Sequence, residues 1–264
     1  MFAHTLNLPG RDAKPRERGL TMVIDPGLPN SCFCDIMASY GDLIDYVKFG
    51  WGTCLATSGI LGKTRAARDN GVEFYFGGTL FEKFLINDRV DEWYKLCSDA
   101  GATVVEISNG TIPLSNAEKA GYIRQFADEF TVLSEVGFKD PVRSETLSPA
   151  RWIDYIQQDL DAGAHFVIAE ARESGRSGIC RPDGELRYGL IEEIAESAID
   201  VNHLMFEAPT KDLQIYLLRR FGPQVNLGNI HSSEVIGLET LRLGLRADTL
   251  TDFDSLVAQE QTHA

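Results

Sequence analysis

Eight short apolar segments, each followed by a helical pattern, recur along almost the whole of this 264-residue chain. A strand followed by a helix, repeated without a break in composition, predicts parallel strands joined by right-handed crossovers. Eight such units are the number that closes a single (β/α)8 TIM barrel. The expected strands cover residues 20–25, 43–47, 72–77, 103–108, 131–137, 166–172, 203–209 and 224–229. The expected helices cover residues 33–42, 59–70, 80–100, 115–129, 149–162, 190–197, 212–221 and 233–243.

Local signals support the helix boundaries and the division of the chain. Ser115 followed by Glu118 is a capping box, and Pro149 suits the first position of a helix. An open, doubly wound sheet is the alternative fold, but no Gly-x-Gly-x-x-Gly motif follows a strand, so dinucleotide binding has no support. We expect residues 1–18 to form an N-terminal extension, residues 19–250 the barrel, which is the catalytic domain, and residues 251–264 a C-terminal tail.

Charge and composition argue against several classes of partner. The formal net charge is −14 and the isoelectric point is near 4.8, which disfavours binding to nucleic acid or to an anionic membrane. No apolar run approaches ~20 residues, and residues 1–18 lack the apolar core of a signal peptide, so we expect a soluble, cytoplasmic protein. The five cysteines are scattered and odd in number, which favours free thiols in a reducing compartment.

Lys48 follows an apolar strand and precedes a glycine-rich turn, Gly50-Trp51-Gly52. An unpaired ammonium group is costly to bury, so this lysine needs either an anionic partner or a lowered pKa. The two glycines allow the backbone to turn sharply or to approach a ligand closely. A structural ion pair with a neighbouring glutamate and a functional role at the strand end are both compatible with this pattern.

Polar residues stand at the carboxyl ends of nearly all the expected strands, and in a barrel these ends meet at the mouth, where active sites lie. Four glutamates there would repel one another, and Lys48 and Arg172 are too few to balance them. A divalent cation would resolve the imbalance, and because only oxygen ligands are in view, Mg²⁺ is the expected ion. A salt bridge within the barrel is the alternative for any one of these carboxylates. The four candidate metal ligands are Glu106, Glu135, Glu170 and Glu207.

Two segments at strand ends suit an anionic ligand. Residues 171–178 combine arginines with small residues, so guanidinium groups and backbone N–H groups can hold a phosphate or a carboxylate. Residues 226–229 end the last strand, close to the region where many barrels bind phosphate. The candidate substrate-binding residues, which include further polar strand ends, are Asp25, Gly78, Thr79, Arg172, Arg176, Asn226, Gly228 and Asn229.

Seven motifs follow one another in order along about residues 16–250: Lys48-Phe-Gly-Trp-Gly-Thr53, Gly77-Gly-Thr-Leu-Phe-Glu82, Glu106-Ile-Ser-Asn-Gly110, Glu170-Ala-Arg-Glu-Ser-Gly175, Phe206-Glu-Ala-Pro209, Val225-Asn-Leu-Gly-Asn229 and Leu238-Glu-Thr-Leu-Arg-Leu-Gly-Leu-Arg246. In this combination the chain closely resembles the phosphosulfolactate synthase family, first known from archaeal coenzyme M biosynthesis. Residues 109–116 and 178–180 look more like the bacterial, Bacillus-type branch than the archaeal one.

This resemblance implies a barrel enzyme of the carbon–sulfur lyase class that adds sulfite to phosphoenolpyruvate with Mg²⁺, giving (2R)-phospho-3-sulfolactate. It also implies a homo-oligomer, with a trimer as the expected form, and a product that enters sulfonate biosynthesis as a precursor of coenzyme M or of sulfolactate. In such a mechanism we expect Lys48 to stabilise charge or donate the proton. Lys139 is the second candidate donor, and Glu106 is a further catalytic group.

Three alternatives are compatible with the same residues. Lys48 would be a Schiff-base nucleophile in an aldolase-type barrel enzyme. Pro26 and Phe138 stand where the archaeal pattern has lysines, which favours a family paralogue that adds a nucleophile other than sulfite to phosphoenolpyruvate. The family that this chain resembles also includes plant heat-stress-associated relatives, so the third alternative is a non-catalytic relative that acts through protein contacts.

Overall fold

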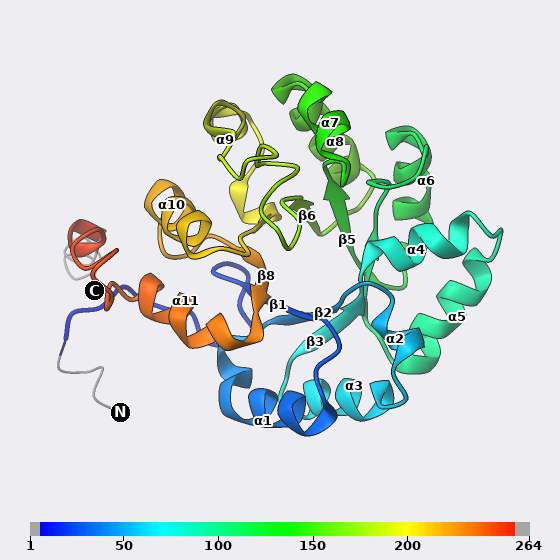
Figure 1. Cartoon of the computed structure of the whole chain (residues 1–264), viewed down its shortest axis with the longest axis horizontal. Helices are drawn as coiled ribbons and strands as arrows, with labels where there is room; N and C mark the ends of the chain where they lie inside the picture. The colour runs from blue at the N-terminus through cyan, green and yellow to red at the C-terminus, as the bar shows by residue number, and fades with distance from the viewer. Residues whose placement is uncertain (1–5, 257–264) are drawn as a thin grey trace.

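The computed structural model describes residues 6–256 and shows eight parallel strands surrounded by helices (Figure 1). The strands are ordered β3-β2-β1-β8-β7-β6-β5-β4, and β3 and β4, at the two ends of this order, contact each other. The sheet is therefore a nearly closed barrel, which confirms the expected (β/α)8 fold. The strands are β1 (Thr21–Asp25), β2 (Tyr46–Phe49), β3 (Glu73–Phe76), β4 (Val104–Ile107), β5 (Thr131–Val136), β6 (Phe166–Ala169), β7 (Leu204–Glu207) and β8 (Leu227–His231).

Helices connect successive strands and cover the outside of the barrel (Figure 1). The capping box that begins at Ser115 and the helix start at Pro149 are confirmed. The helices are α1 (Asn30–Tyr40), α2 (Thr53–Ala56), α3 (Ile60–Asp69), α4 (Gly78–Leu85), α5 (Val90–Ala100), α6 (Asn116–Phe126), α7 (Pro141–Thr146), α8 (Pro149–Asp161), α9 (Tyr188–Glu196), α10 (Lys211–Phe221) and α11 (Val235–Arg242).

Several elements differ from the sequence prediction, among them the short helix α2, which was not expected. The helix expected over residues 80–100 is two helices, α4 and α5, because the chain turns between them, where Asp88 has a positive φ of 55°. Helix α7 occupies a segment that was expected to be a loop. Strand β8 begins at Leu227 rather than at residue 224, and this shift moves the residues before it to the amino end of the barrel.

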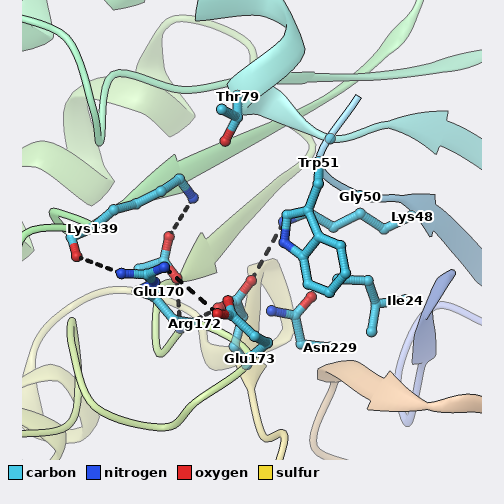
Figure 2. A pocket seen from close by; sticks show the side chains of 12 residues that line it. Ile24, Lys48, Gly50, Trp51, Thr79, Lys139, Glu170, Arg172, Glu173 and Asn229 are labelled. Carbon is cyan, nitrogen blue, oxygen red and sulfur yellow. Dashed lines mark hydrogen bonds and ion pairs between the residues drawn. The ribbon is translucent and has the colours of Figure 1, made fainter. Parts of the chain in front are cut away.

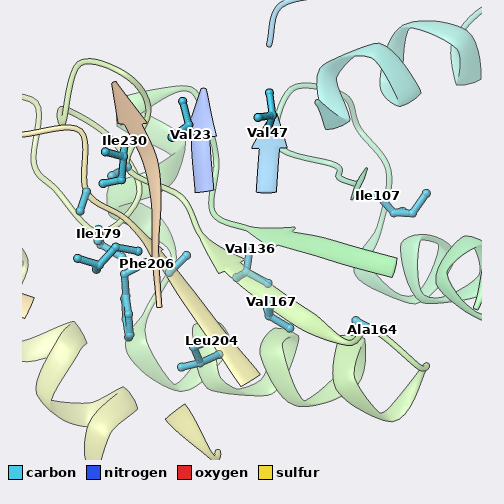
Figure 3. Close-up of a cluster of buried hydrophobic side chains, with 14 of the residues drawn as sticks. Val23, Val47, Ile107, Val136, Ala164, Val167, Ile179, Leu204, Phe206 and Ile230 are labelled. Atoms are coloured by element: carbon cyan, nitrogen blue, oxygen red, sulfur yellow. The ribbon is translucent and has the colours of Figure 1, made fainter. Parts of the chain in front are cut away.

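Successive side chains along each strand point to opposite faces of the sheet, so they alternate between the helix-covered outer face and the barrel interior. Val47 in β2 and Val136 in β5 point outward and pack beneath the helices (Figure 3). Their neighbours Lys48 and Glu135 point inward, where they contact each other. Next to this charged layer the interior is filled by an apolar cluster of Leu20, Met22, Tyr75, Val104, Leu133, Phe166, Ile168 and Met205.

The N-terminal segment and α11 close the amino end of the barrel. Arg16 Nε lies 3.0 Å from Asp45 Oδ1, and both side chains are buried. Arg11 forms an ion pair with Glu239 of α11 at 3.0 Å. Arg242, fully buried, donates hydrogen bonds to the carbonyl oxygens of Leu20, Pro223 and Val225. These contacts leave the carboxyl ends of the strands as the open end.

The cysteines and the hydrophobicity of the helices can also be compared with the sequence analysis. All five cysteines are free thiols, as the sequence predicts. Among residues 6–256 no helix is long and apolar enough to cross a membrane.

Candidate active site

Lys48 lies inside the barrel among three glutamates from three other strands. Its Nζ atom is 3.1 Å from Glu106 Oε2, 3.4 Å from Glu135 Oε2 and 3.4 Å from Glu207 Oε1. Burial lowers the pKa of Lys48, but the charges of Glu106, Glu207 and Glu135 outweigh it and raise that pKa well above its ordinary value. The three carboxylates therefore favour the ammonium form of Lys48.

Lys139 supplies a second ammonium group from the loop after β5. Its Nζ atom donates hydrogen bonds to Glu135 Oε1 at 2.8 Å and to Glu170 Oε2 at 2.7 Å. Burial lowers the pKa of Lys139, but Glu135 and Glu170 outweigh that effect and raise the pKa well above its ordinary value. Among the described residues, Glu135 is the one carboxylate that forms ion pairs with both Lys48 and Lys139.

The carboxylates of Glu170 and Glu207 are held by backbone N–H groups of the loop after β6. The N–H groups of Ala171 and Arg172 each donate to Glu207 Oε2 at 2.9 Å. The Arg172 N–H also lies 2.6 Å from Glu170 Oε1. Arg172 has a positive φ of 59°, a conformation disfavoured for residues with a side chain, and it aims one N–H at both carboxylates.

Glu106 is fixed by the start of helix α4. The N–H of Gly78 donates to Glu106 Oε1 at 2.6 Å. A Cβ atom at Gly78 would lie 2.6 Å from that oxygen and 2.5 Å from Ser108 Oγ, so only glycine allows this approach. Burial raises the pKa of Glu106, although Lys48 opposes the rise.

Three of the four predicted metal ligands form a group suited to a cation. Carboxylate oxygens of Glu135, Glu170 and Glu207 all lie within 4.8 Å of one another, and all three residues are buried. Glu106 lies outside this group, although it shares Lys48 with two of its members. Four buried carboxylates against two ammonium groups leave an excess negative charge, and all the ligand atoms are oxygens. The residues therefore fit a hard divalent cation such as Mg²⁺.

A cavity of about 170 Å³ opens beside these charges at the carboxyl ends of the strands (Figure 2). Its size is below the range of about 300–1,000 Å³ typical of drug-sized ligands, so it suits a small metabolite. In Figure 2, Lys139 and Arg172 lie on one side of it and Trp51 and Asn229 on the other. The lining residues are Ile24, Lys48, Gly50, Trp51, Gly77, Thr79, Lys139, Glu170, Arg172, Glu173, Glu207 and Asn229.

Backbone strain is concentrated around this cavity. In the described part of the chain four non-glycine residues have a positive φ, and three of them, Trp51, Arg172 and Asn229, line the cavity. Asn229 also has a buried Oδ1 atom without a hydrogen-bond partner among the described residues. Strained residues and unsatisfied polar atoms gather at ligand sites, because the ligand supplies what the free protein lacks.

The other predicted substrate-binding residues lie elsewhere. Asp25 is buried, and its carboxylate accepts hydrogen bonds from the N–H groups of Gly27 and Leu28 and pairs with Lys63 at 2.5 Å. Asn226 lies at the opposite end of the barrel, where its side chain accepts a hydrogen bond from the N–H of Leu20, just before β1, and donates to the carbonyl oxygen of Leu204 in β7.

Two further predicted residues are not among the described residues that line the cavity. Gly228 sits in the barrel interior, where a Cβ atom would be 2.7 Å from Met22 Cε. Arg176 is exposed and is not among the described residues that line the cavity. The structure thus brings together the two lysines, the four glutamates, Thr79, Arg172 and Asn229, while Gly78 contributes its backbone.

Several residues at the site were not identified from the sequence, and two of them, Trp51 and Tyr75, are aromatic. Trp51 lines the mouth with 59% of its surface exposed, and its position between two glycines was the available signal. Tyr75 lies opposite Lys48 in the pairing of β2 and β3, and its buried hydroxyl has no hydrogen-bond partner among the described residues. Burial and the charge of Glu106 raise the pKa of Tyr75 well above its ordinary value, so its hydroxyl is protonated.

The model of the (2R)-phospho-3-sulfolactate synthase (ComA) family matches residues 9–248. The chain belongs to this family. A phosphosulfolactate synthase of Bacillus subtilis is 49% identical over 245 residues, which cover 93% of this chain and 97% of the relative. A phosphosulfolactate synthase of Methanothermobacter thermautotrophicus is 42% identical over 254 residues, 95% of this chain and 98% of the relative.

One more distant sequence relative and two solved structures of low sequence identity are also similar to this chain. Protein HEAT-STRESS-ASSOCIATED 32 of Arabidopsis thaliana is 24% identical and covers 88% of each chain. Among solved structures, a 3-hexulose-6-phosphate synthase superposes with a TM-score of 0.53 at 15% identity, covering 90% of this chain and 98% of that one. The carboxyl transferase domain of Rhizobium etli pyruvate carboxylase gives 0.56 at 10% identity, covering 84% and 41%. These structures support the barrel fold alone.

Proposed function

We propose that this chain is a phosphosulfolactate synthase that adds sulfite to phosphoenolpyruvate in a Mg²⁺-dependent reaction, giving (2R)-phospho-3-sulfolactate. The observation that carries the proposal is the cluster of two ammonium groups and four buried carboxylates beside a small cavity, in a chain of this family. Both proposed substrates are anions, and each needs fixed positive charge to approach the other.

The reaction forms one carbon–sulfur bond and one carbon–hydrogen bond. The sulfur lone pair of sulfite attacks the methylene carbon of phosphoenolpyruvate, and the electrons of the carbon–carbon double bond move towards the carboxylate. A proton then reaches the carbon that bears the phosphate. The demanding step brings two anions together while charge grows on the carboxylate, so charge stabilisation is the main task of the site.

Different residues at the cavity would stabilise the charge, bind the substrate oxygens and hold the cation. Lys48 is the preferred group to stabilise the carboxylate charge or donate the proton, and Lys139 is the second candidate, since both line the cavity as ammonium groups. Arg172, Thr79 and Asn229 would bind the phosphate and sulfite oxygens. Glu135, Glu170 and Glu207 would hold Mg²⁺, which when bound supplies positive charge that stabilises the developing carboxylate dianion.

The alternatives have weaker support. A Schiff-base mechanism needs a neutral amine, whereas three carboxylates keep Lys48 protonated. A different nucleophile was suggested by Pro26 and Phe138, but neither is among the described residues that line the cavity. A non-catalytic protein would have no use for buried, mutually repelling carboxylates at the barrel mouth.

Further parts of the proposal rest on the family resemblance. We infer a cytoplasmic enzyme that assembles from copies of this chain, with a trimer as the expected form, and a product that enters sulfonate biosynthesis. Sedimentation of the purified protein tests the assembly, and a monomer would contradict it.

A phosphorus NMR assay tests the proposed reaction. Purified protein is incubated with phosphoenolpyruvate in four samples, with and without sulfite and with and without Mg²⁺. We expect the phosphoenolpyruvate signal to fall and a new phosphate ester signal to grow only when both sulfite and Mg²⁺ are present. Glu207→Gln is the matched inactive variant, because it removes one carboxylate charge from the cluster. An unchanged spectrum from the folded wild-type protein would contradict the proposal.

A further inference from the structure

A buried ion pair lies behind Glu135, outside the barrel wall and away from the cavity. Lys119 of α6 and Asp159 of α8 both have fully buried side chains, and Lys119 Nζ is 2.6 Å from Asp159 Oδ2. The same ammonium group donates to the main-chain carbonyl oxygen of Glu135 at 2.8 Å. Asn116 Nδ2, at the start of α6, approaches Asp159 Oδ1 at 3.3 Å. Two helices and one strand therefore meet at a single charged contact.

The Glu135 carbonyl needs this donor because the strand ladder ends beside it. The pairing of β4 with β5 ends with Ile107 opposite Ser134. On the other edge of β5, the carbonyl oxygens of Val132 and Val136 accept hydrogen bonds from the β6 side. Neighbouring residues of a strand face opposite edges, so the Glu135 carbonyl faces the β4 side, beyond the last residue of that strand. A buried carbonyl left unpaired would be unfavourable, and the Lys119 ammonium group replaces the missing partner.

Stability alone does not account for a fully buried charge pair. Replacing such a pair by apolar residues of similar volume is often neutral or stabilising, because two charges no longer have to leave water. Here the pair is hydrogen-bonded, through Lys119, to the main-chain carbonyl oxygen of Glu135. The carboxylate of Glu135 lies 3.4 Å from Lys48 Nζ and 2.8 Å from Lys139 Nζ, so it contacts both lysines of the site.

We propose that Lys119 and Asp159 are positioning residues that hold the β5 backbone at Glu135, so that its carboxylate joins Lys48 and Lys139 in the geometry the reaction requires. Lys119 binds the Glu135 carbonyl, and Asp159 neutralises and orients Lys119. Neither residue touches the cavity. The kinetic part of the test rests on the proposed function, whereas the structural part does not.

The test compares Lys119→Met with the double variant Lys119→Met/Asp159→Leu. The single variant leaves Asp159 buried without its partner, so we expect a clear fall in the urea midpoint. The double variant removes both charges and keeps the volume, so we expect its urea midpoint to return close to that of the wild type. Its kcat should stay about ten- to a hundred-fold below wild type with KM for phosphoenolpyruvate little changed, because a small displacement of a catalytic group is costly.

The matched control is Arg16→Met/Asp45→Leu, which removes another buried ion pair at the opposite end of the barrel. We expect its kcat to equal that of the wild type. A double variant at Lys119 and Asp159 that recovers both stability and kcat would overturn the proposal, because the pair would then be structural only. If it does not fold, Asp159→Asn supplies the comparison. The amide oxygen of the introduced asparagine can still accept a hydrogen bond from Lys119 and orient it toward Glu135, so we expect kcat within about three-fold of wild type, whereas kcat of Lys119→Met should be at least about ten-fold lower. A Lys119→Met protein that keeps the kcat of the wild type would overturn the proposal.

A crystal structure of the double variant separates this proposal from the proposed function. We expect the Glu135 carboxylate to move away from Lys48 or Lys139, even if the wild-type protein proves inactive with sulfite. An unmoved carboxylate would overturn the positioning role, whereas an inactive wild type with a displaced carboxylate would overturn only the reaction.

Discussion

Lys48 shows at the scale of one residue how structural and functional roles coincide. The sequence left an ion pair and a functional group as alternatives, and the structure shows an ammonium group that pairs with three glutamates and also lines the cavity. The carboxylates that make its burial possible also keep it charged. Lys48 is thus suited to stabilise an anion and unsuited to act as a free amine.

Replacing Lys48 by Met tests this role. We expect turnover to fall by about a hundred-fold or more, because a fixed charge is lost where negative charge develops. The exposed Lys83→Met is the control and should keep wild-type turnover. If the Lys48→Met protein keeps more than about a tenth of the wild-type activity, Lys48 is not a catalytic group in this reaction.

The same variant should acquire a pH-dependent loss of stability. The pKa of Glu106 is already raised by burial, and Lys48 opposes that rise, so loss of Lys48 raises the pKa of Glu106 further. A carboxyl whose folded-state pKa is raised favours folding below its unfolded pKa and loses that contribution as pH rises through the folded value. The deficit in melting temperature relative to wild type should therefore be larger near about pH 8 than near about pH 5. An equal deficit at both values would contradict this assignment.

At the scale of elements, Asp25 joins β1 to α3. Its two carboxylate oxygens are used within the protein, one by the N–H groups of Gly27 and Leu28 and the other by Lys63 of α3. The strand end predicted to bind substrate instead anchors a loop and a helix. This arrangement favours a structural role, although the substrate-binding prediction is open to a direct test.

Asp25→Asn and Lys63→Met form the pair of variants for that test. Each leaves one buried charge without its partner, so we expect each to lower the free energy of unfolding by about 3–5 kcal/mol in urea titrations. KM for phosphoenolpyruvate should stay close to the wild-type value in both. A KM that rises strongly in Asp25→Asn and not in Lys63→Met would instead establish Asp25 as a substrate ligand.

At the scale of the whole molecule, the two ends of the barrel have different tasks. The carboxyl end holds the cavity, the lysines and the glutamates. The amino end is closed by Arg11, Arg16 and Arg242, which pair with acidic residues or with backbone carbonyl groups. Changes at the amino end should therefore alter stability without altering the chemistry.

Arg16→Met and Arg18→Met test this division with a matched pair. The Arg16–Asp45 pair is almost fully buried, with 4% and 6% of the side chains exposed, whereas the Arg18–Asp12 pair is exposed by 56% and 46%. We expect Arg16→Met to cost about 3–5 kcal/mol of stability, because Asp45 keeps a buried charge. Arg18→Met should cost about 0–1 kcal/mol. Both should keep wild-type kcat, and a lost kcat in Arg16→Met would contradict the separation of the two ends.

The parts of the molecule that depend on local pattern were predictable. Alternating strands and helices predicted the barrel, and the fold then implied that Lys48 and the four glutamates meet at one end. The segment around residues 86–89 was missed because α4 and α5 are both apolar on one face, and only the left-handed turn at Asp88 separates them. Asn226 was misplaced because the sequence does not show that β8 begins at Leu227, three residues later than expected.

The amino-acid sequence by itself determined the family, the barrel and the identity of the charged residues at its mouth, because these depend on periodicity and on motifs of adjacent residues. Only the tertiary structure decided which charges meet. Lys48 contacts carboxylates 87 and 159 positions away along the chain, and Lys119 reaches the Glu135 carbonyl from a helix outside the barrel. Distances of a few ångströms between such remote residues depend on strand register and helix packing, which no local pattern of residues specifies.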